Sequence, residues 1–95
     1  MTELNGRAET AHAVLYMNKM AKHFRHKVPV QLEEGWAVIE FEAGRCALSA
    51  DAARLNARIE AASPEAAEVV REVIDRHLPR FAPKEALTIN WQLAD

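Results

Sequence analysis

Residues 28–60, VPVQLEEGWAVIEFEAGRCALSADAARLNARIE, decide the fold, because apolar and polar side chains alternate along most of this stretch. A period of two is typical of strands with one buried face, and the alternation restarts after turns at Glu34-Gly35, Gly44 and Asp51. We therefore predict four consecutive antiparallel strands that form a meander. Pro29 lacks a backbone N–H, which places the first strand at an edge of the sheet or makes it start there.

The alternation also divides the strand side chains between two faces. Cys46, Leu48 and Ile59 fall on the inward face. The opposite face is predicted to be uncovered and mostly polar, carrying Gln31, Glu33, Trp36, Val38, Glu40, Arg54, Asn56, Arg58, Thr88 and Asn90. We predict an interface at Trp36 and Val38, because tryptophan is enriched at protein contacts. The alternative is that a loop or the N-terminal arm covers Trp36.

Two amphipathic helices are predicted on either side of the four strands. The first spans Thr10–Lys27, with Thr10 as its N-cap and Val28-Pro29 as its stop signal. The second begins at Ser63-Pro64-Glu65, which supplies a capping hydroxyl, a proline at the first helical position and an acid in the first turn, and it runs to about Leu78. The predicted buried stripes are Ala13, Val14, Met17, Met20, Ala21 and Phe24 on the first helix, and Ala66, Val69, Val70, Val73, Ile74 and His77 on the second.

The remaining segments complete a single domain over residues 1–95. Residues 1–9 are predicted to be a frayed arm or a short edge strand, because Gly6 weakens a strand. Pro79 and Pro83 bracket a predicted linker, and Leu87–Gln92 form a last strand. The expected fold is α+β, a two-layer sandwich in the order helix, four strands, helix, strand. Its antiparallel sheet has about five strands, with both helices on one face.

Composition limits the classes of function. The 95 residues are 49% hydrophobic, which suits one domain with its own core, and the net charge of -2 gives no overall attraction to nucleic acid or to an anionic membrane surface. The single cysteine excludes an intramolecular disulfide, and no apolar run approaches the ~20 residues that cross a bilayer. The N-terminus lacks the pattern of a secretion signal. We expect a cytoplasmic protein that binds neither nucleic acid nor a membrane.

The polar side of the first helix carries a row of titratable side chains, namely His12, Tyr16, Lys19, His23 and His26, and the helix ends in the basic run His23-Phe24-Arg25-His26-Lys27. We predict a ligand-binding surface here, formed by Tyr16, His23, His26, Lys27 and Arg80. The alternative is a solvated helix end whose cations suit the helix dipole.

A transition metal is a second candidate ligand of the same surface. His23 and His26 are three residues apart, so both imidazoles can reach one ion, and Cys46 or His77 would complete a tetrahedral set of nitrogen and sulfur ligands. His77 has an alternative interpretation as a neutral core histidine bonded to a backbone carbonyl. Cys46 is most simply a small buried hydrophobe, and a nucleophilic role beside a histidine is the least favoured hypothesis. No catalytic residue is assigned.

The sequence as a whole resembles a bacterial family catalogued as domain of unknown function 2218. The resemblance rests on Tyr16 with residues 23–27, on Gly44 with Cys46 and Leu48, and on residues 77–82 with Glu85, Leu87 and Trp91. At Pro83-Lys84 the chain departs from the family pattern, where an aromatic residue and an arginine are expected.

The resemblance implies no assigned activity, and it implies a link to iron uptake, because some family members lie beside or are joined to a siderophore-interacting reductase. We therefore expect a non-catalytic binding or accessory domain for an anionic ligand such as a ferric siderophore, with such a reductase as one candidate partner. The alternative is a structural module that forms a homodimer or docks a partner through the uncovered sheet face.

Overall fold

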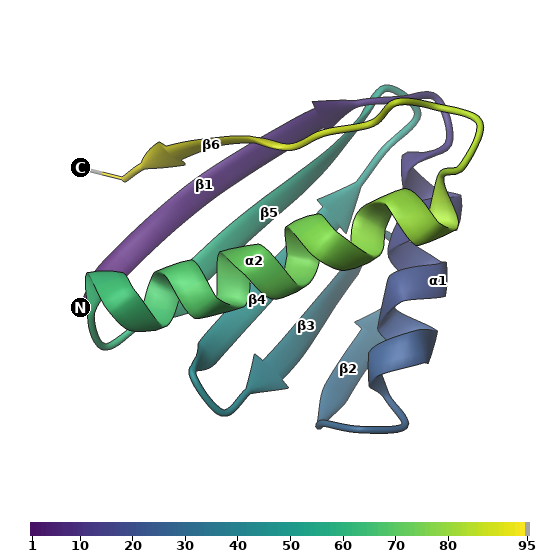
Figure 1. Cartoon of the computed structure of the whole chain (residues 1–95). Helices are drawn as coiled ribbons and strands as arrows, with labels where there is room; N and C mark the ends of the chain where they lie inside the picture. Colours follow the sequence, from purple (N-terminus) through teal and green to yellow (C-terminus); the bar gives the residue numbers. More distant parts are fainter. Residues whose placement is uncertain (95) are drawn as a thin grey trace.

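The computed structural model describes residues 1–94 and has two layers, a six-stranded antiparallel sheet and two helices that cover one of its faces (Figure 1). The elements are β1 (Thr2–Glu9), α1 (Ala13–Phe24), β2 (Val30–Glu33), β3 (Trp36–Phe41), β4 (Gly44–Ala50), β5 (Arg54–Ala61), α2 (Pro64–Phe81) and β6 (Asn90–Leu93). The sheet order is β2-β3-β4-β5-β1-β6. The predicted α+β sandwich is confirmed, with six strands in place of about five.

The meander predicted from the alternation is formed by β2, β3, β4 and β5, which pair in sequence order. Gly35 makes the first turn with a positive φ of 83°, a conformation that suits glycine because it has no Cβ. β2 is an edge strand, as Pro29 indicated. The alternation therefore placed both the strands and their faces correctly in this part of the chain.

The prediction for residues 1–9 is wrong, because β1 is a long interior strand. It pairs with β5 over all eight residues and with β6 on its other side. Gly6 is needed there for packing: a Cβ on it would lie 2.5 Å from Cγ2 of Ile89 and 2.6 Å from the indole ring of Trp91. The glycine that suggested a weak strand makes room for these two side chains.

The last strand is shorter than predicted and begins at Asn90, where pairing with Arg7 of β1 starts. Its Trp91 crosses β1 and donates a hydrogen bond from Nε1 to Oδ1 of Asp75 on α2, at 2.8 Å. Ile89, just before the strand, is still buried at 8% exposure. The C-terminal segment thus connects the edge of the sheet to the helix layer.

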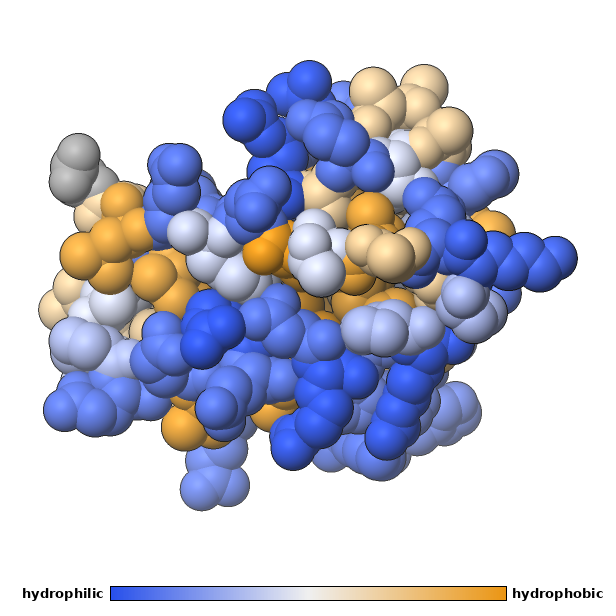
Figure 2. Space-filling view, turned by 45° about the horizontal axis from the view of Figure 1, so that its top comes forward, coloured by the Kyte–Doolittle hydropathy of each residue, from blue (hydrophilic) through white to orange (hydrophobic). Residues whose placement is uncertain are grey.

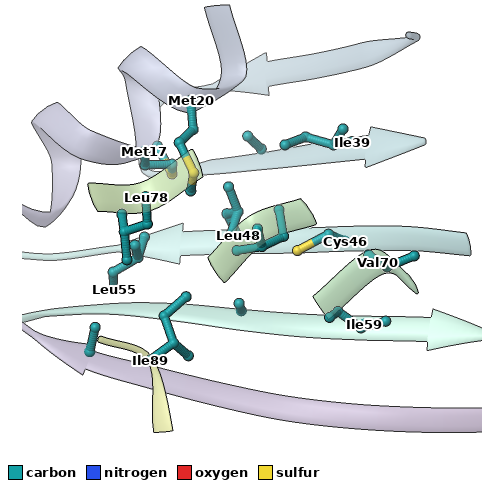
Figure 3. Close-up of a cluster of buried hydrophobic side chains, with 14 of the residues drawn as sticks. Met17, Met20, Ile39, Cys46, Leu48, Leu55, Ile59, Val70, Leu78 and Ile89 are labelled. Carbon is teal, nitrogen blue, oxygen red and sulfur yellow. The ribbon is translucent and has the colours of Figure 1, made fainter. Parts of the chain in front are cut away.

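The hydrophobic core lies between the helices and the sheet (Figure 3). Met17 and Met20 reach down from α1, and Val70 and Leu78 reach down from α2. They meet the inward side chains of the central strands, which are fully buried: Ile39, Cys46, Leu48, Leu55 and Ile59. This core holds the two helices in fixed positions on the sheet.

The first helix is shorter than predicted and is rotated relative to the predicted stripe. Its N-cap residue is His12, without a side-chain cap, and Thr10 Oγ1 instead accepts the His12 N–H in the turn before the helix. Val14 was predicted to be buried but is 43% exposed, whereas Tyr16, placed on the polar side, is only 7% exposed. Tyr16 is buried because its hydroxyl has a partner far along the chain, which a helical periodicity cannot show.

The start of α2 is confirmed, since Ser63 Oγ accepts the N–H of Ala66 at 3.1 Å and Pro64 is the first helical residue. The helix continues three residues past Leu78 and includes Pro79, so the predicted linker is partly helical. A proline removes one helical hydrogen bond, and here it does so only in the last turn. The predicted stripe is also partly wrong, because Val69 is 51% exposed, while Ala67 and Leu78 are buried.

The sheet face opposite the helices, which we name the open face, remains uncovered by any element of residues 1–94. The larger exposed apolar side chains are spread over several elements, including Val14 and Leu15 on α1, Val69 on α2, Trp36 on β3 and Leu93 on β6. Figure 2 shows a mainly hydrophilic surface with small separate hydrophobic areas. Within residues 1–94, neither helix is long and apolar enough to cross a membrane.

Candidate functional site

Five of the predicted site residues belong to one region, where the C-terminal part of α2 packs beside the end of α1. We name it the helix-end cluster and define it as His23, His26, Lys27, His77 and Arg80. The rings of His23 and His77 have centroids 5.3 Å apart, although 54 residues separate them in the chain. The ring of His23 also packs edge-on against Phe24 and Phe81, with centroid distances of 5.1 and 5.7 Å.

Two of the three imidazoles of the cluster, those of His23 and His77, differ in their hydrogen bonding. Nδ1 of His77 lies 2.7 Å from the carbonyl oxygen of Val73, so this nitrogen carries the proton and donates it. The carbonyl-bonded interpretation of His77 is thus confirmed, although its side chain is half-buried and not in the core. Nε2 of His23 is buried and has no hydrogen-bond partner among the described residues.

The surroundings of His23 disfavour its charged form. Burial is the main cause that lowers its pKa below the usual value for histidine, and the positive charges of Lys27, His77, Arg80 and His26 lower the pKa further. Each charged group that acts on this imidazole is basic. The helix-end cluster is therefore locally electropositive, although the whole chain carries a net charge of -2.

We expect the free energy of unfolding to decrease as the pH falls from about 7 to about 5, because folding favours neutral His23. The unfolded chain binds this proton near its usual pKa of about 6.5, whereas the folded chain binds it only at a lower pH. The contribution is therefore complete above the unfolded pKa and is lost as the pH falls. Urea unfolding of His23→Leu at several pH values should give a flatter dependence than the unsubstituted chain.

The matched control for this pH series is His26→Leu, which replaces an exposed imidazole three residues further along the chain. A His23→Leu variant with the same pH dependence as the unsubstituted chain would contradict the assignment of the proton to His23.

The predicted metal ligands come together only in part, because His23 and His77 meet but Cys46 does not join them. Cys46 lies on β4 between Ile39 and Ile59, in the core and fully buried, and burial raises the pKa of its thiol to about 12. Among residues 1–94, no three histidine, cysteine or acidic side chains are grouped so that they can hold a metal ion. The described residues therefore do not fit a tetrahedral centre, and a protonated, enclosed thiol cannot serve as a nucleophile.

Tyr16 belongs to a different group of residues, at the other end of α1. Its hydroxyl donates a hydrogen bond to Glu85 Oε2, and the Thr10 hydroxyl donates to Oε1 of the same carboxylate at 2.9 Å. These two donors lower the pKa of Glu85, and the interaction raises the pKa of Tyr16. A protonated phenol and an ionised carboxylate form a stable pair, which attaches the segment after α2 to the start of α1.

The pairing of Glu85 with Thr10 and Tyr16 could not be predicted from the sequence. Its two partners, Thr10 and Tyr16, are 75 and 69 residues away in the chain. Glu85 lies in a turn, where no periodicity indicates which face a side chain takes. Only the fold therefore shows its contact with Thr10 and Tyr16.

The open face carries side chains in rows that cross the strands, because the register aligns them. The first row is Glu33, Trp36, Ser49, Asn56, Arg7 and Asn90. The second row is Gln31, Val38, Ala47, Arg58, Asn5 and Gln92. A groove of about 380 Å³ runs over the middle of these rows, lined among others by Trp36, Val38 and Arg58. Trp36 is 40% exposed, so the predicted apolar spot does lie on the open face.

Comparison with known proteins supports the resemblance. Residues 5–92 match a family described as an uncharacterized protein conserved in bacteria (DUF2218). The fold is similar to the NMR structure of PA4090 from Pseudomonas aeruginosa, with a TM-score of 0.82 and 28% identity over 97% of this chain and 96% of that chain. No significant match was found among curated proteins. With its family match over most of the sequence, the chain belongs to the DUF2218 family of bacterial proteins.

Proposed function

We propose that this chain is a non-catalytic binding domain that takes an anionic ligand at the helix-end cluster. The observation that carries the proposal is the charge around His23, where each group that shifts its pKa is basic. An anion placed there would interact favourably with Lys27 and Arg80 and would favour protonated His23.

The packing of the cluster also suits a binding site. His23, His77 and Arg80 come from two helices that the core fixes on the sheet, and His26 and Lys27 lie in the turn directly after α1. The backbone positions of the cations are therefore set before a ligand arrives. Nε2 of His23 is buried without a partner among the described residues, so a bound anion would act on this imidazole through its charge, by favouring the protonated form. Phe81 beside it adds an apolar surface for a ligand with aromatic groups.

A ferric siderophore is the first ligand to test, because the family resemblance suggests iron uptake and many such complexes are anionic. In this proposal the complex is cargo, and the chain supplies only cations and an aromatic contact. A siderophore-interacting reductase remains the proposed partner, and the cytoplasm is the compartment in which we expect it to act.

Calorimetric titration with an iron(III) tris-catecholate complex, with citrate and with zinc chloride would test this function. We expect the tris-catecholate complex to bind, with an affinity that falls as salt is added, because exposed cations are screened. His23→Ala/Lys27→Ala should weaken binding by at least about tenfold, whereas Lys19→Ala, an exposed lysine of the same helix, should not. Absence of heat with both anions, or equal binding by the two variants, would refute the proposal.

A further inference from the structure

The open face presents two unlike walls on either side of β4. Trp36 and Val38 rise from β3 on one side, and Asn56 and Arg58 rise from β5 on the other. Two strand spacings separate these walls, which is about 10 Å. Between them β4 presents only Ala47 and Ser49, so the floor of the groove is low.

The walls are complementary to each other in chemistry. An exposed indole and a guanidinium attract through a cation–π contact, and tryptophan and arginine are the residues most enriched at the centres of interfaces. Arg58 is exposed, and it takes part in none of the ion pairs found among residues 1–94. Within one chain β4 lies between the two walls and keeps their backbones about 10 Å apart.

From this arrangement we infer that two copies of the chain associate through their open faces, about a two-fold axis that runs along β4. Such a rotation places β3 of one copy over β5 of the other. The indole of Trp36 then packs on the Asn56 and Arg58 wall of the second copy, and the same contact is made a second time by symmetry. Ala47 and Ser49 of β4 lie on the axis, where two packed sheets approach to about 10 Å, and Arg45 lies on the axis at one end of the face.

Charge complementarity favours a second copy as the occupant. The same rotation places β2 over β1, so Glu33 of each copy faces Arg7 of the other. Arg7 is otherwise only loosely paired with Glu9, at 3.8 Å and with both side chains about 60% exposed. A third row, formed by Glu40, Arg45 and Glu60 at one end of the face, meets itself under the same rotation, with Glu40 over Glu60 and Arg45 over Arg45 of the other copy. Within each chain these charges already offset one another, because Arg45 lies between the two carboxylates.

The size of the face suits a weak association. The rotation overlaps five strands, because β6 lies beyond β1 and has no counterpart next to β2, so the shared width is about 24 Å. The overlapping lengths are four residues on β2, six on β3 and seven on β4, about 13 to 23 Å, and the shared outline is therefore smaller than the about 800 Å² per partner that a standard interface buries. Because most of the face is polar, the structure assigns it to a reversible dimer that forms at elevated concentration.

Sedimentation equilibrium of the whole chain from about 10 μM to about 1 mM would test the dimer. We expect the mass to approach twice that of the monomer, and Trp36→Ser or Arg58→Glu to raise the dissociation constant at least about tenfold. Arg76→Glu is the control, because it makes the same charge change on the exposed side of α2. Far-UV circular dichroism would show that each variant is folded.

A charge exchange distinguishes this geometry from other dimers. Glu33→Arg and Arg7→Glu should each weaken association, and the double variant should restore it, because the two residues face each other across the axis. A monomer throughout the concentration range, or a dimer that Trp36→Ser leaves unchanged, would overturn the inference. Neither result would bear on ligand binding at the helix-end cluster, which lies on the opposite side of the sheet.

Discussion

Leu48→Ala is expected to lower the free energy of unfolding by about 2–5 kcal/mol. Leu48 is 1% exposed on β4, at the centre of the core (Figure 3). Its partners in register on β3 and β5 are Ala37 and Ala57, so Leu48 is the only large inward side chain in this row of the three central strands. The two alanines cannot extend into the cavity, which favours the upper part of the range.

The matched control is Leu93→Ala, the same chemical change at a leucine that is 69% exposed on the edge strand β6. We expect the free energy of unfolding of this variant to differ from that of the unsubstituted chain by about 0.5 kcal/mol or less. Urea unfolding of the three proteins at neutral pH would measure both effects. Equal stability of the two variants would mean that the core does not have the packing described.

Gly6→Ala is expected to destabilise the fold by about 1–3 kcal/mol through overpacking alone. The added methyl would lie within 2.8 Å of three side-chain atoms, one from Ile89 and two from Trp91. The indole has little room to move, because its Nε1 donates to Asp75, and a shift that breaks this bond adds to the loss. An ordinary interior position of a strand would tolerate alanine.

A double-mutant cycle with Trp91→Ala isolates the contact. In the Trp91→Ala background, Gly6→Ala should lower the free energy of unfolding by less than it does in the unsubstituted chain, because part of the clash is already removed. The expected coupling energy between the two substitutions is about 0.5–3 kcal/mol. Fluorescence in a Trp36→Phe background would report on Trp91 alone and should shift to longer wavelength in Gly6→Ala. Additive effects of the two substitutions would show that the indole does not rest on Gly6.

The sequence predicted the structure best where a local pattern, such as alternation or a helix cap, has a single structural meaning. Alternation along most of residues 28–60 predicted four strands, their order and the uncovered face, and Ser63-Pro64 predicted the start of α2. Both helices were predicted, but their buried stripes were rotated in part, since Val14 and Val69 are exposed. A valine on an amphipathic helix indicates burial only on average, and tertiary packing decides the individual case.

The remaining features depend on contacts between distant segments. Gly6 suggested a weak strand because its partner Trp91 is 85 residues away, and Tyr16 was placed on the polar side because nothing near it reveals Glu85. His23 and His77 were expected on neighbouring helices and do meet, but Cys46 faces the core on the sheet. Spacing in the sequence could suggest ligands for a metal, whereas only the fold could separate them.

The position of β1 between β5 and β6 has a consequence for the order of folding. The meander closes only short loops, since each strand pairs with the next, but β1 must find β5 about 50 residues along the chain. Closing a longer loop costs more entropy, and proteins with many such distant pairs fold more slowly. The least costly order therefore forms the meander first, adds β1 to its free edge and completes the sheet with β6. Until then, the long strand that begins the chain has two unsatisfied edges, and this interval is when the protein is most exposed to aggregation.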